Sequence, residues 1–209
     1  MNRHSYFHIF LGGEIVVKRD KPKYKQIIDA AVVVIAENGY HQAQVSKIAK
    51  QAKVADGTIY LYFKNKEDIL ISVFQEKMGL FVNKLEGILT RGGSASEKLG
   101  FMIESHFKLL ADDLNLSIVT QLELRQSNYE IRMKINGVLR EYLVLMDKIL
   151  IEGMENGEFD AEMDIRLARQ MVFGTMDETI TTWVMNDHKY DLVKLAPKVH
   201  RLLMKGMRA

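Results

Sequence analysis

Proline is almost missing from this chain, and its scarcity is the feature that most limits the fold. Only Pro22 and Pro197 occur among 209 residues, and they stand near opposite ends. Between them, apolar residues recur three and four positions apart, and no segment alternates convincingly with a period of two. Because proline is the strongest breaker of helices, this long stretch is free to be helical. The sequence therefore predicts an all-α fold.

Capping signals divide the helical chain into segments. Gly39 is typical of a residue that ends a helix, and Asn65 is suited to cap the start of a long one. Ser94 and Glu97 have the spacing of a capping box. Pro197 either kinks the last segment or marks its beginning. We expect helices over about 23–38, 45–51, 56–63, 66–91, 95–111, 114–126, 128–155 and 164–185, and a last one from about 191.

Composition excludes several classes of protein. The sequence has no cysteine, which excludes a disulfide framework and fits the reducing cytoplasm, where we expect the protein. Its six histidines are scattered, so no metal site is expected. The longest apolar run, 30–36, is too short to span a bilayer. Enzyme motifs such as G-x-G-x-x-G, the P-loop, H-E-x-x-H and G-x-S-x-G are absent, so we expect neither an enzyme nor a cofactor.

Charge is unevenly distributed along the chain. Between residues 18 and 66, ten Lys and Arg stand against four Asp and Glu. Because the whole chain carries only +2, the remainder carries about −4. A basic module joined to a slightly acidic one indicates that only the first meets phosphates. Taken alone, this charge pattern fits an ordinary solvated face equally well.

The stretch 45–64, VSKIAKQAKVADGTIYLYFK, fits a helix-turn-helix. Two short helices that cross steeply need a small residue where they touch, and Ala49 supplies it. The second helix would present small or polar residues to the major groove. The apolar residues that would point toward the first helix of the chain are Val45, Ile48, Ala52, Val54 and Ile59.

Side chains on and around this motif are candidates for contacts with double-stranded DNA. Thr58 and Tyr60 can reach base edges, and Gly57 lets the backbone approach closely. Tyr62 and Lys66 are better suited to hold phosphates, which position a protein without reading sequence. The alternative is that the tyrosines belong to the core. The predicted DNA contacts are Gln44, Ser46, Lys47, Gly57, Thr58, Tyr60, Tyr62 and Lys66.

This segment resembles the signature of the TetR family of bacterial repressors. The resemblance implies a three-helix N-terminal domain that binds DNA and a long helix that leads into a C-terminal ligand-binding and dimerisation domain. It also implies a homodimer on a palindromic operator. The residues that carry it are Gly39, Tyr40, Val45, Ile48, Ala49, Val54, Gly57, Thr58, Ile59, Tyr60, Tyr62, Phe63, Lys66 and Glu67.

Two residues depart from the family pattern. Lys53 stands where the family usually has Gly, and a left-handed backbone there would cost roughly 1–2 kcal/mol. Asp56 is unusual beside DNA. It can favour the helix N-terminus or accept a hydrogen bond from a cytosine amine, and both interpretations leave the operator sequence open.

The C-terminal segments are rich in methionine and aromatic residues. Such residues can line a pocket for a flexible apolar ligand, or they can simply form the core. The last two segments are unusually apolar around Gly174, so two copies could pack as a four-helix bundle across a twofold axis. The candidates for ligand contact in this region are Phe81, Leu85, Ile103, Phe107, Met146, Met176 and Trp183.

Two further stretches carry a more specific resemblance. Residues 121–136, QLELRQSNYEIRMKIN, and 164–187, DIRLARQMVFGTMDETITTWVMND, resemble the fatty-acid-degradation repressors of Bacillus and its relatives within this family. The resemblance runs from about residue 18 to the C-terminus and implies long-chain acyl-CoA as the effector that releases DNA. The candidates to hold the phosphates of CoA are Arg125, Asn128 and Arg132; ordinary surface or salt-bridge roles fit them at least as well.

We therefore expect three regions: a leader over 1–17, a DNA-binding domain over 18–66 and a ligand-binding and dimerisation domain over 67–209. The leader is interpreted as disordered or mis-annotated. Its Gly12-Gly13-Glu14 is what a ribosome-binding site would encode if it were translated, with a true start at Val16 or Val17.

Other functions remain open from the sequence. A TetR-type sensor of drug-like or cationic molecules that controls efflux genes would need buried carboxylates beside aromatic rings, and Glu178 is one candidate. An architectural DNA binder would ignore ligands. An enzyme with a helix-turn-helix appendage would need catalytic residues that converge in the pocket.

Overall fold

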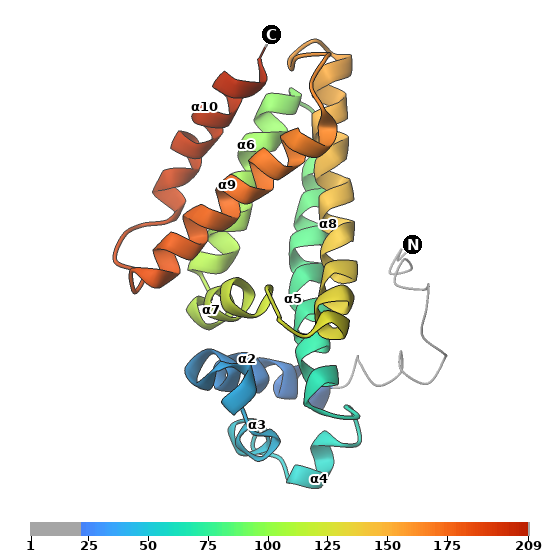
Figure 1. The fold of residues 1–209 in the computed structure, drawn as a ribbon, viewed down its shortest axis with the longest axis vertical. Coiled ribbons are helices and arrows are strands. Elements are labelled where there is room, and N and C mark those ends of the chain that lie inside the picture. The colour runs from blue at the N-terminus through green and yellow to red at the C-terminus, as the bar shows by residue number, and fades with distance from the viewer. Residues whose placement is uncertain (1–21, 209) are drawn as a thin grey trace.

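The computed structural model describes residues 22–208, and within this range it consists of helices joined by loops, without strands (Figure 1). The all-α prediction is confirmed. The expected leader, 1–17, lies outside the described residues. The helices are α2 (Pro22–Gln42), α3 (Val45–Gln51), α4 (Asp56–Ile59), α5 (Lys66–Leu89), α6 (Ala95–Ala111), α7 (Leu114–Glu123), α8 (Tyr129–Glu155), α9 (Ile165–Met185), the 3₁₀ helix η1 (Val193–Leu195) and α10 (Ala196–Met207).

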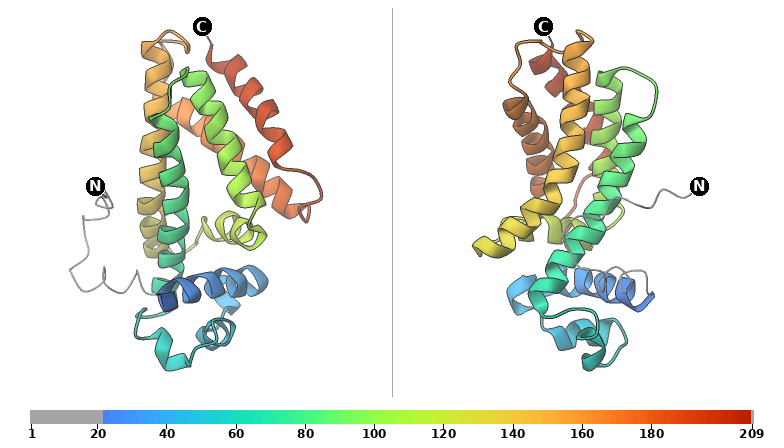
Figure 2. Two further views of the ribbon diagram at one scale, coloured as in Figure 1. Left: turned by 180° about the vertical axis from the view of Figure 1, so that it is seen from behind. Right: turned by 90° about the vertical axis from the view of Figure 1, so that its right-hand side faces the viewer.

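Helices α2, α3 and α4 gather at one end of the molecule (Figures 1 and 2), and we call them the head. Ile48, Ala49 and Ile59 of the motif have no exposed surface, because they lie in the core, where α3 packs on α2 and α4 packs on α3. Tyr24 of α2 stacks on Phe63, with ring centroids 5.2 Å apart. The motif is therefore held to α2 by its apolar residues, as its spacing predicted.

The rest of the chain forms an elongated helical body above the head (Figures 1 and 2). Helix α5 rises from the head and packs most extensively along α8, with α6 beside both. Helices α9 and α10 cover the other side. Helix α7 lies where body and head meet, packed on α2. The head, which would bind DNA, therefore contacts the body, which would bind a ligand, through two helices, α5 and α7.

The capping signals are confirmed. The Asn65 side chain accepts a hydrogen bond from the backbone N–H of Asp68 and begins α5. Ser94 and Glu97 form both bonds of the capping box that begins α6. Gly39 is left-handed, with φ of 71°, and breaks the helical geometry of α2 there, although helical hydrogen bonding resumes to Gln42. Pro197 lies in the first turn of α10, so it marks the beginning of that helix.

Three predicted helices end earlier in the structure, and one of them, expected to reach residue 91, ends at Leu89. The second motif helix was expected over 56–63, but α4 ends at Ile59 and the chain continues in tighter turns. In these turns the N–H of Leu61 donates to the carbonyl of Thr58 at 3.2 Å. Glycine, β-branched and aromatic residues have low helix propensity, which explains the early end of this segment. The helix expected over 114–126 ends at Glu123.

Lys53 has a φ of 51°, the left-handed conformation in which the family usually places glycine. We expect Lys53→Gly to raise the free energy of unfolding by roughly 0.5–1 kcal/mol, because relief of strain outweighs the extra freedom of unfolded glycine. Urea denaturation measures this change. Lys50→Gly is the matched control: Lys50 is helical in α3, so its replacement should destabilise by about 0.5–1 kcal/mol. Equal losses in both variants would contradict the strain at Lys53.

Candidate DNA-binding and ligand-binding sites

The end of the head that faces away from the body carries the predicted DNA contacts. Tyr60 and Leu61 project from the turn after α4 and are 60% and 63% exposed. Gly57 is exposed, with no atom within 4 Å of the position a Cβ would take. An exposed aromatic ring beside an open stretch of backbone is suited to enter a major groove.

The structure places the eight predicted DNA contacts in two groups. Five are exposed: Gln44, Ser46, Lys47, Gly57 and Tyr60. Three are half-buried: Thr58, Tyr62 and Lys66. Lys47 donates to the side chain of Asn38 at 2.7 Å. The roles of all eight in DNA binding are predictions.

Lys66, predicted to contact a DNA phosphate, forms hydrogen bonds within the protein. Its ammonium donates to the carbonyl oxygens of Tyr40 and His41, each at 2.9 Å. It also lies 4.7 Å from the centre of the Tyr40 ring. Lys66 therefore fastens the first turn of α5 to the end of α2, which fixes the angle between the head and the long helix.

A buried carboxylate on α7 joins the body to the end of α2, which Lys66 also contacts. Glu123, at the end of α7, accepts a hydrogen bond from the backbone N–H of Tyr40 at 2.9 Å. Its other oxygen accepts from the side chain of Gln126. Burial and the nearby carboxylates of Glu67 and Glu123 raise the pKa of Tyr40. The segment just after Gly39 is thus held by α5 on one side and by α7 on the other.

Seven predicted ligand contacts are buried in the body: Phe81, Leu85, Ile103, Phe107, Met146, Met176 and Trp183. Phe81 and Leu85 border a small cavity between α5, α6 and α8. The other five pack in the core away from it, and the indole N–H of Trp183 donates to the carbonyl of Tyr190 at 2.7 Å. Their assignment to a ligand stays a prediction.

The three predicted phosphate contacts lie around the α7–α8 connection, each with a partner in the protein. Arg125 pairs with Asp177 of α9. Asn128 caps α8 through the N–H of Ile131. Arg132 donates to the carbonyl of Gln126 at 3.1 Å. This connection follows α7, which packs on α2 of the head, and 56% of the Arg125 side chain is exposed.

The cavity has a volume of about 10 Å³, room for about one water. Most of its wall is apolar, and Lys84 borders it from an exposed position. Two polar groups meet in it: Nδ1 of His106, on α6, lies 2.8 Å from the hydroxyl of Tyr142, on α8. The lining residues are Phe81, Lys84, Leu85, Ile88, Met102, Ser105, His106, Leu109 and Tyr142.

Burial keeps this pair uncharged. It lowers the pKa of His106 from 6.5 to about 3 and raises the pKa of Tyr142 above its usual value. His106 was not among the residues predicted from the sequence to contact a ligand. The signal was present: His106 falls on the apolar face of a helix, four positions after Met102 and four before Leu110.

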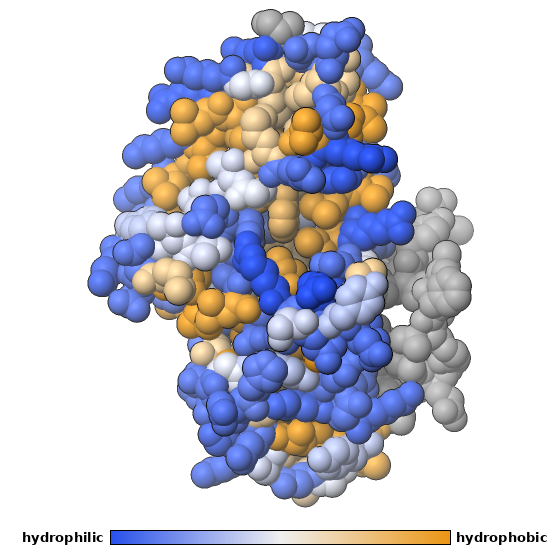
Figure 3. All heavy atoms as spheres, in the orientation of Figure 1, coloured by the Kyte–Doolittle hydropathy of each residue, from blue (hydrophilic) through white to orange (hydrophobic). Residues whose placement is uncertain are grey.

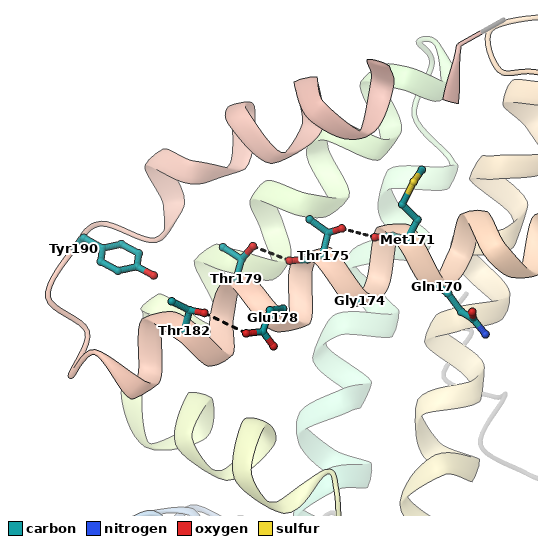
Figure 4. A pocket seen from close by; sticks show the side chains of 8 residues that line it. All are labelled: Gln170, Met171, Gly174, Thr175, Glu178, Thr179, Thr182 and Tyr190. Atoms are coloured by element: carbon teal, nitrogen blue, oxygen red, sulfur yellow. Dashed lines mark hydrogen bonds between the residues drawn. The ribbon is translucent and has the colours of Figure 1, made fainter. Parts of the chain in front are cut away.

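A second hollow is an open groove of about 630 Å³ along α9 (Figure 4). Small residues form much of it, including Gly174, and the hydroxyls of Thr175 and Thr179 donate back to carbonyls of their own helix. Leu167 on α9 and Leu202 on α10 are also exposed. Apolar side chains gather over these two helices in Figure 3. The groove is lined by Gln170, Met171, Gly174, Thr175, Glu178, Thr179, Thr182 and Tyr190.

Two absences concern the part of the chain that the structure describes. No helix in it is long and apolar enough to cross a membrane. No group of His, Asp and Glu in residues 22–208 is arranged to hold a metal ion.

Comparisons with known proteins decide the family. Residues 27–73 match the family described as bacterial regulatory proteins, tetR family, and residues 74–206 match the C-terminal region of YsiA-like proteins. The chain belongs to the TetR family. Its members regulate transcription and are not enzymes, as the missing catalytic motifs predicted.

Proteins described as regulators of fatty acid metabolism or degradation match about nine-tenths of this TetR-family chain. The fatty acid metabolism regulator protein of Bacillus subtilis is 65% identical over 191 residues, which cover 91% of this chain and 98% of the relative. The fatty acid degradation regulator FadR of Bacillus halodurans has a TM-score of 0.85 and 63% identity, over 88% of this chain and all of that one. FadR of Bacillus subtilis in complex with stearoyl-CoA also has a TM-score of 0.85, with 66% identity over 88% and 98% of the two chains.

If Tyr60 contacts a base edge, Tyr60→Ala should weaken binding to the operator by roughly tenfold, since such a contact is worth about 1–3 kcal/mol. Binding to random DNA, which rests on phosphates, should change little. Fluorescence anisotropy with both DNAs measures this. Tyr129→Ala removes a similarly exposed tyrosine from the body and should change neither affinity. Equal weakening on both DNAs would contradict base contact.

The buried His106 predicts a loss of stability in acid. Below its usual pKa of 6.5 the unfolded chain binds a proton that the folded chain takes up only near pH 3. Stability from this group is therefore complete above pH 6.5 and falls as the pH drops, by about 2 kcal/mol between pH 7 and pH 5. Urea denaturation at both pH values should show this loss in the wild type and in the exposed control His41→Phe. An equal loss in His106→Phe would contradict the assignment.

Proposed function

We propose that this protein represses fatty-acid degradation genes and leaves its palindromic operator when long-chain acyl-CoA binds. The observation that carries the proposal is the 66% identity, over 88% of this chain, to a FadR whose structure holds stearoyl-CoA. The likeness includes the C-terminal domain, where regulators of this family differ according to their ligands. Acyl-CoA is thus an effector of this protein and not a cofactor.

The chemistry of the body supports an acyl ligand. The small cavity between α5, α6 and α8 is bordered by apolar side chains and by a neutral His–Tyr pair. An acyl chain would enter by widening this space, which separates the three helices. Arg125, Asn128 and Arg132 stay the candidates for the phosphates of CoA, since arginine forms strong paired bonds with phosphate.

A sensor of cationic molecules fits these features less well. The cavity is bordered by no carboxylate among the described residues. Asp177 is buried but already paired with Arg125. Glu178 is exposed in the α9 groove rather than enclosed beside aromatic rings. A buried cation would find no free counter-charge in these places.

The groove on α9 supports a homodimer. Its small side chains and satisfied hydroxyls would let a second copy of α9 and α10 approach closely and form a four-helix bundle. A twofold dimer of this kind carries two heads, and an operator with two half-sites one or more helical turns apart would receive them. Work on chromosomal DNA would place the protein in the cytoplasm.

The mechanism we propose is a shift between two head positions. The head is fastened to the body through Lys66 on α5 and through Glu123 on α7. A ligand that spreads α5, α6 and α8 moves both attachments, so the two heads no longer match the half-sites. To change occupancy from 99:1 to 1:99, the ligand must prefer the released form by about 5.5 kcal/mol.

The test is a gel shift with DNA from promoters of β-oxidation genes, titrated with acyl-CoAs of increasing chain length. We expect long-chain acyl-CoAs to release the DNA at lower concentrations than short-chain ones, because each buried CH₂ adds about 0.8 kcal/mol. A neutral detergent of equal chain length is the control. Release by the detergent but by no acyl-CoA would contradict the proposed ligand.

The hydrogen bond between Glu123 and Tyr40 predicts a variant in which ligand binding is uncoupled from DNA binding. Glu123→Ala leaves the N–H of Tyr40 and the amide of Gln126 without their buried acceptor. We expect the ratio of operator affinities without and with palmitoyl-CoA to fall roughly tenfold, in the range of typical coupling energies. The exposed Glu130→Ala, one helix further on, should keep the wild-type ratio. An unchanged ratio in Glu123→Ala would show that this bond does not transmit the signal.

A further inference from the structure

One nitrogen of His106 has no partner in the part of the chain that the structure describes. Its Nδ1 meets the Tyr142 hydroxyl at 2.8 Å, but Nε2 has no hydrogen bond to any described residue. The His106 residue is only 8% exposed. A polar atom that has no protein partner and belongs to a side chain at a cavity is available to a ligand.

The side chains around His106 indicate that its unpaired nitrogen belongs to a ligand site. The imidazole and phenol both border the cavity between α5, α6 and α8, together with apolar side chains such as Leu85 and Met102. The Phe81 ring lies against the imidazole at a tilt of 49°, with centroids 4.6 Å apart. Apart from the half-buried Ser105 and the exposed Lys84, the pair is the polar part of an apolar wall.

The chemistry of this pair selects an uncharged acceptor. When the phenol donates to Nδ1, the imidazole hydrogen lies on Nε2, which is then a donor that needs an acceptor. Burial is the cause that keeps both groups neutral, and the one charged side chain at the cavity, Lys84, is exposed among the described lining residues. A neutral carbonyl fits such a donor, whereas a buried anion would pay a large desolvation cost.

We propose that Nε2 of His106, oriented by Tyr142, donates a hydrogen bond to the thioester carbonyl oxygen of the acyl ligand. This inference rests on the proposed function, because it assigns a residue to the effector named there. The carbonyl is the uncharged acceptor nearest to the apolar chain of an acyl-CoA, so it is the group that this pair can hold while the chain fills apolar space. Tyr142 acts as a positioning residue, since its hydroxyl, when it donates to Nδ1, leaves the imidazole hydrogen on Nε2.

The experiment removes the two halves of this hydrogen bond separately. Palmitoyl-CoA is compared with S-hexadecyl-CoA, a thioether of the same chain length that lacks the carbonyl oxygen. Operator release by each ligand is titrated for the wild type, His106→Phe, Tyr142→Phe and Met102→Leu. The last variant changes an apolar lining residue at similar volume and is the matched control. Because both ligands are compared on each variant, changes in stability or DNA affinity cancel from the ratio.

We expect the wild type and Met102→Leu to prefer the thioester by about three- to tenfold, the value of one hydrogen bond. His106→Phe should lose this preference, and Tyr142→Phe should reduce it. Isotope-edited infrared spectra of ¹³C=O palmitoyl-CoA should show a hydrogen-bonded carbonyl on the wild type that is absent on His106→Phe.

Retention of the full preference by His106→Phe would overturn the inference, and so would a wild type that does not distinguish the two ligands. A buried water as the sole partner of Nε2 would give one of these results. Failure of the proposed function is distinguishable, because then neither ligand would release the wild type from its operator.

Discussion

Helix α5 belongs to both halves of this molecule, and the rest of the structure depends on that continuity. It has 24 residues, about 36 Å of helix. Its first turn is fastened to the end of α2 by Lys66, and further along Phe81 and Leu85 border the cavity in the body. A rigid rod of this kind turns a small change of packing in the body into a displacement of the head.

The second link is short and specific. Glu123 joins α7 to the backbone of Tyr40, next to the left-handed Gly39. Because helix α2 is interrupted there, this backbone N–H takes a side-chain acceptor from the body. The head is thus held at two points on neighbouring residues. Two attachments define an orientation, which is what a dimer needs in order to match two half-sites.

The fold could be predicted because its signals are local. Helix caps such as Asn65 and Ser94 act within four residues, and the motif is recognised by the spacing of small and apolar side chains. The predicted division at 66/67 is less informative, since α5 begins at Lys66 and runs through it into the body. The domain boundary at this position stays a prediction. The structure shows a continuous helix there and not a linker.

The sites were harder to predict because their partners are distant in sequence. Glu123 and Tyr40 are 83 positions apart, and His106 and Tyr142 are 36 apart, so no local pattern brings them together. For the same reason Lys66 was assigned to phosphate alone, without its carbonyl partners on α2. What the sequence did offer was a polar residue on an apolar helix face, which is the mark of His106.

The most direct test of the account is the distance between the two heads of the dimer. The chain has no cysteine, so Lys64→Cys, at an exposed position in the head, carries one spin label per protomer. Pulsed electron paramagnetic resonance then measures the distance between labels in the free, operator-bound and palmitoyl-CoA-bound protein. We predict that palmitoyl-CoA moves this distance away from its operator-bound value. An unchanged distance, at a concentration of palmitoyl-CoA that releases the operator, would contradict it.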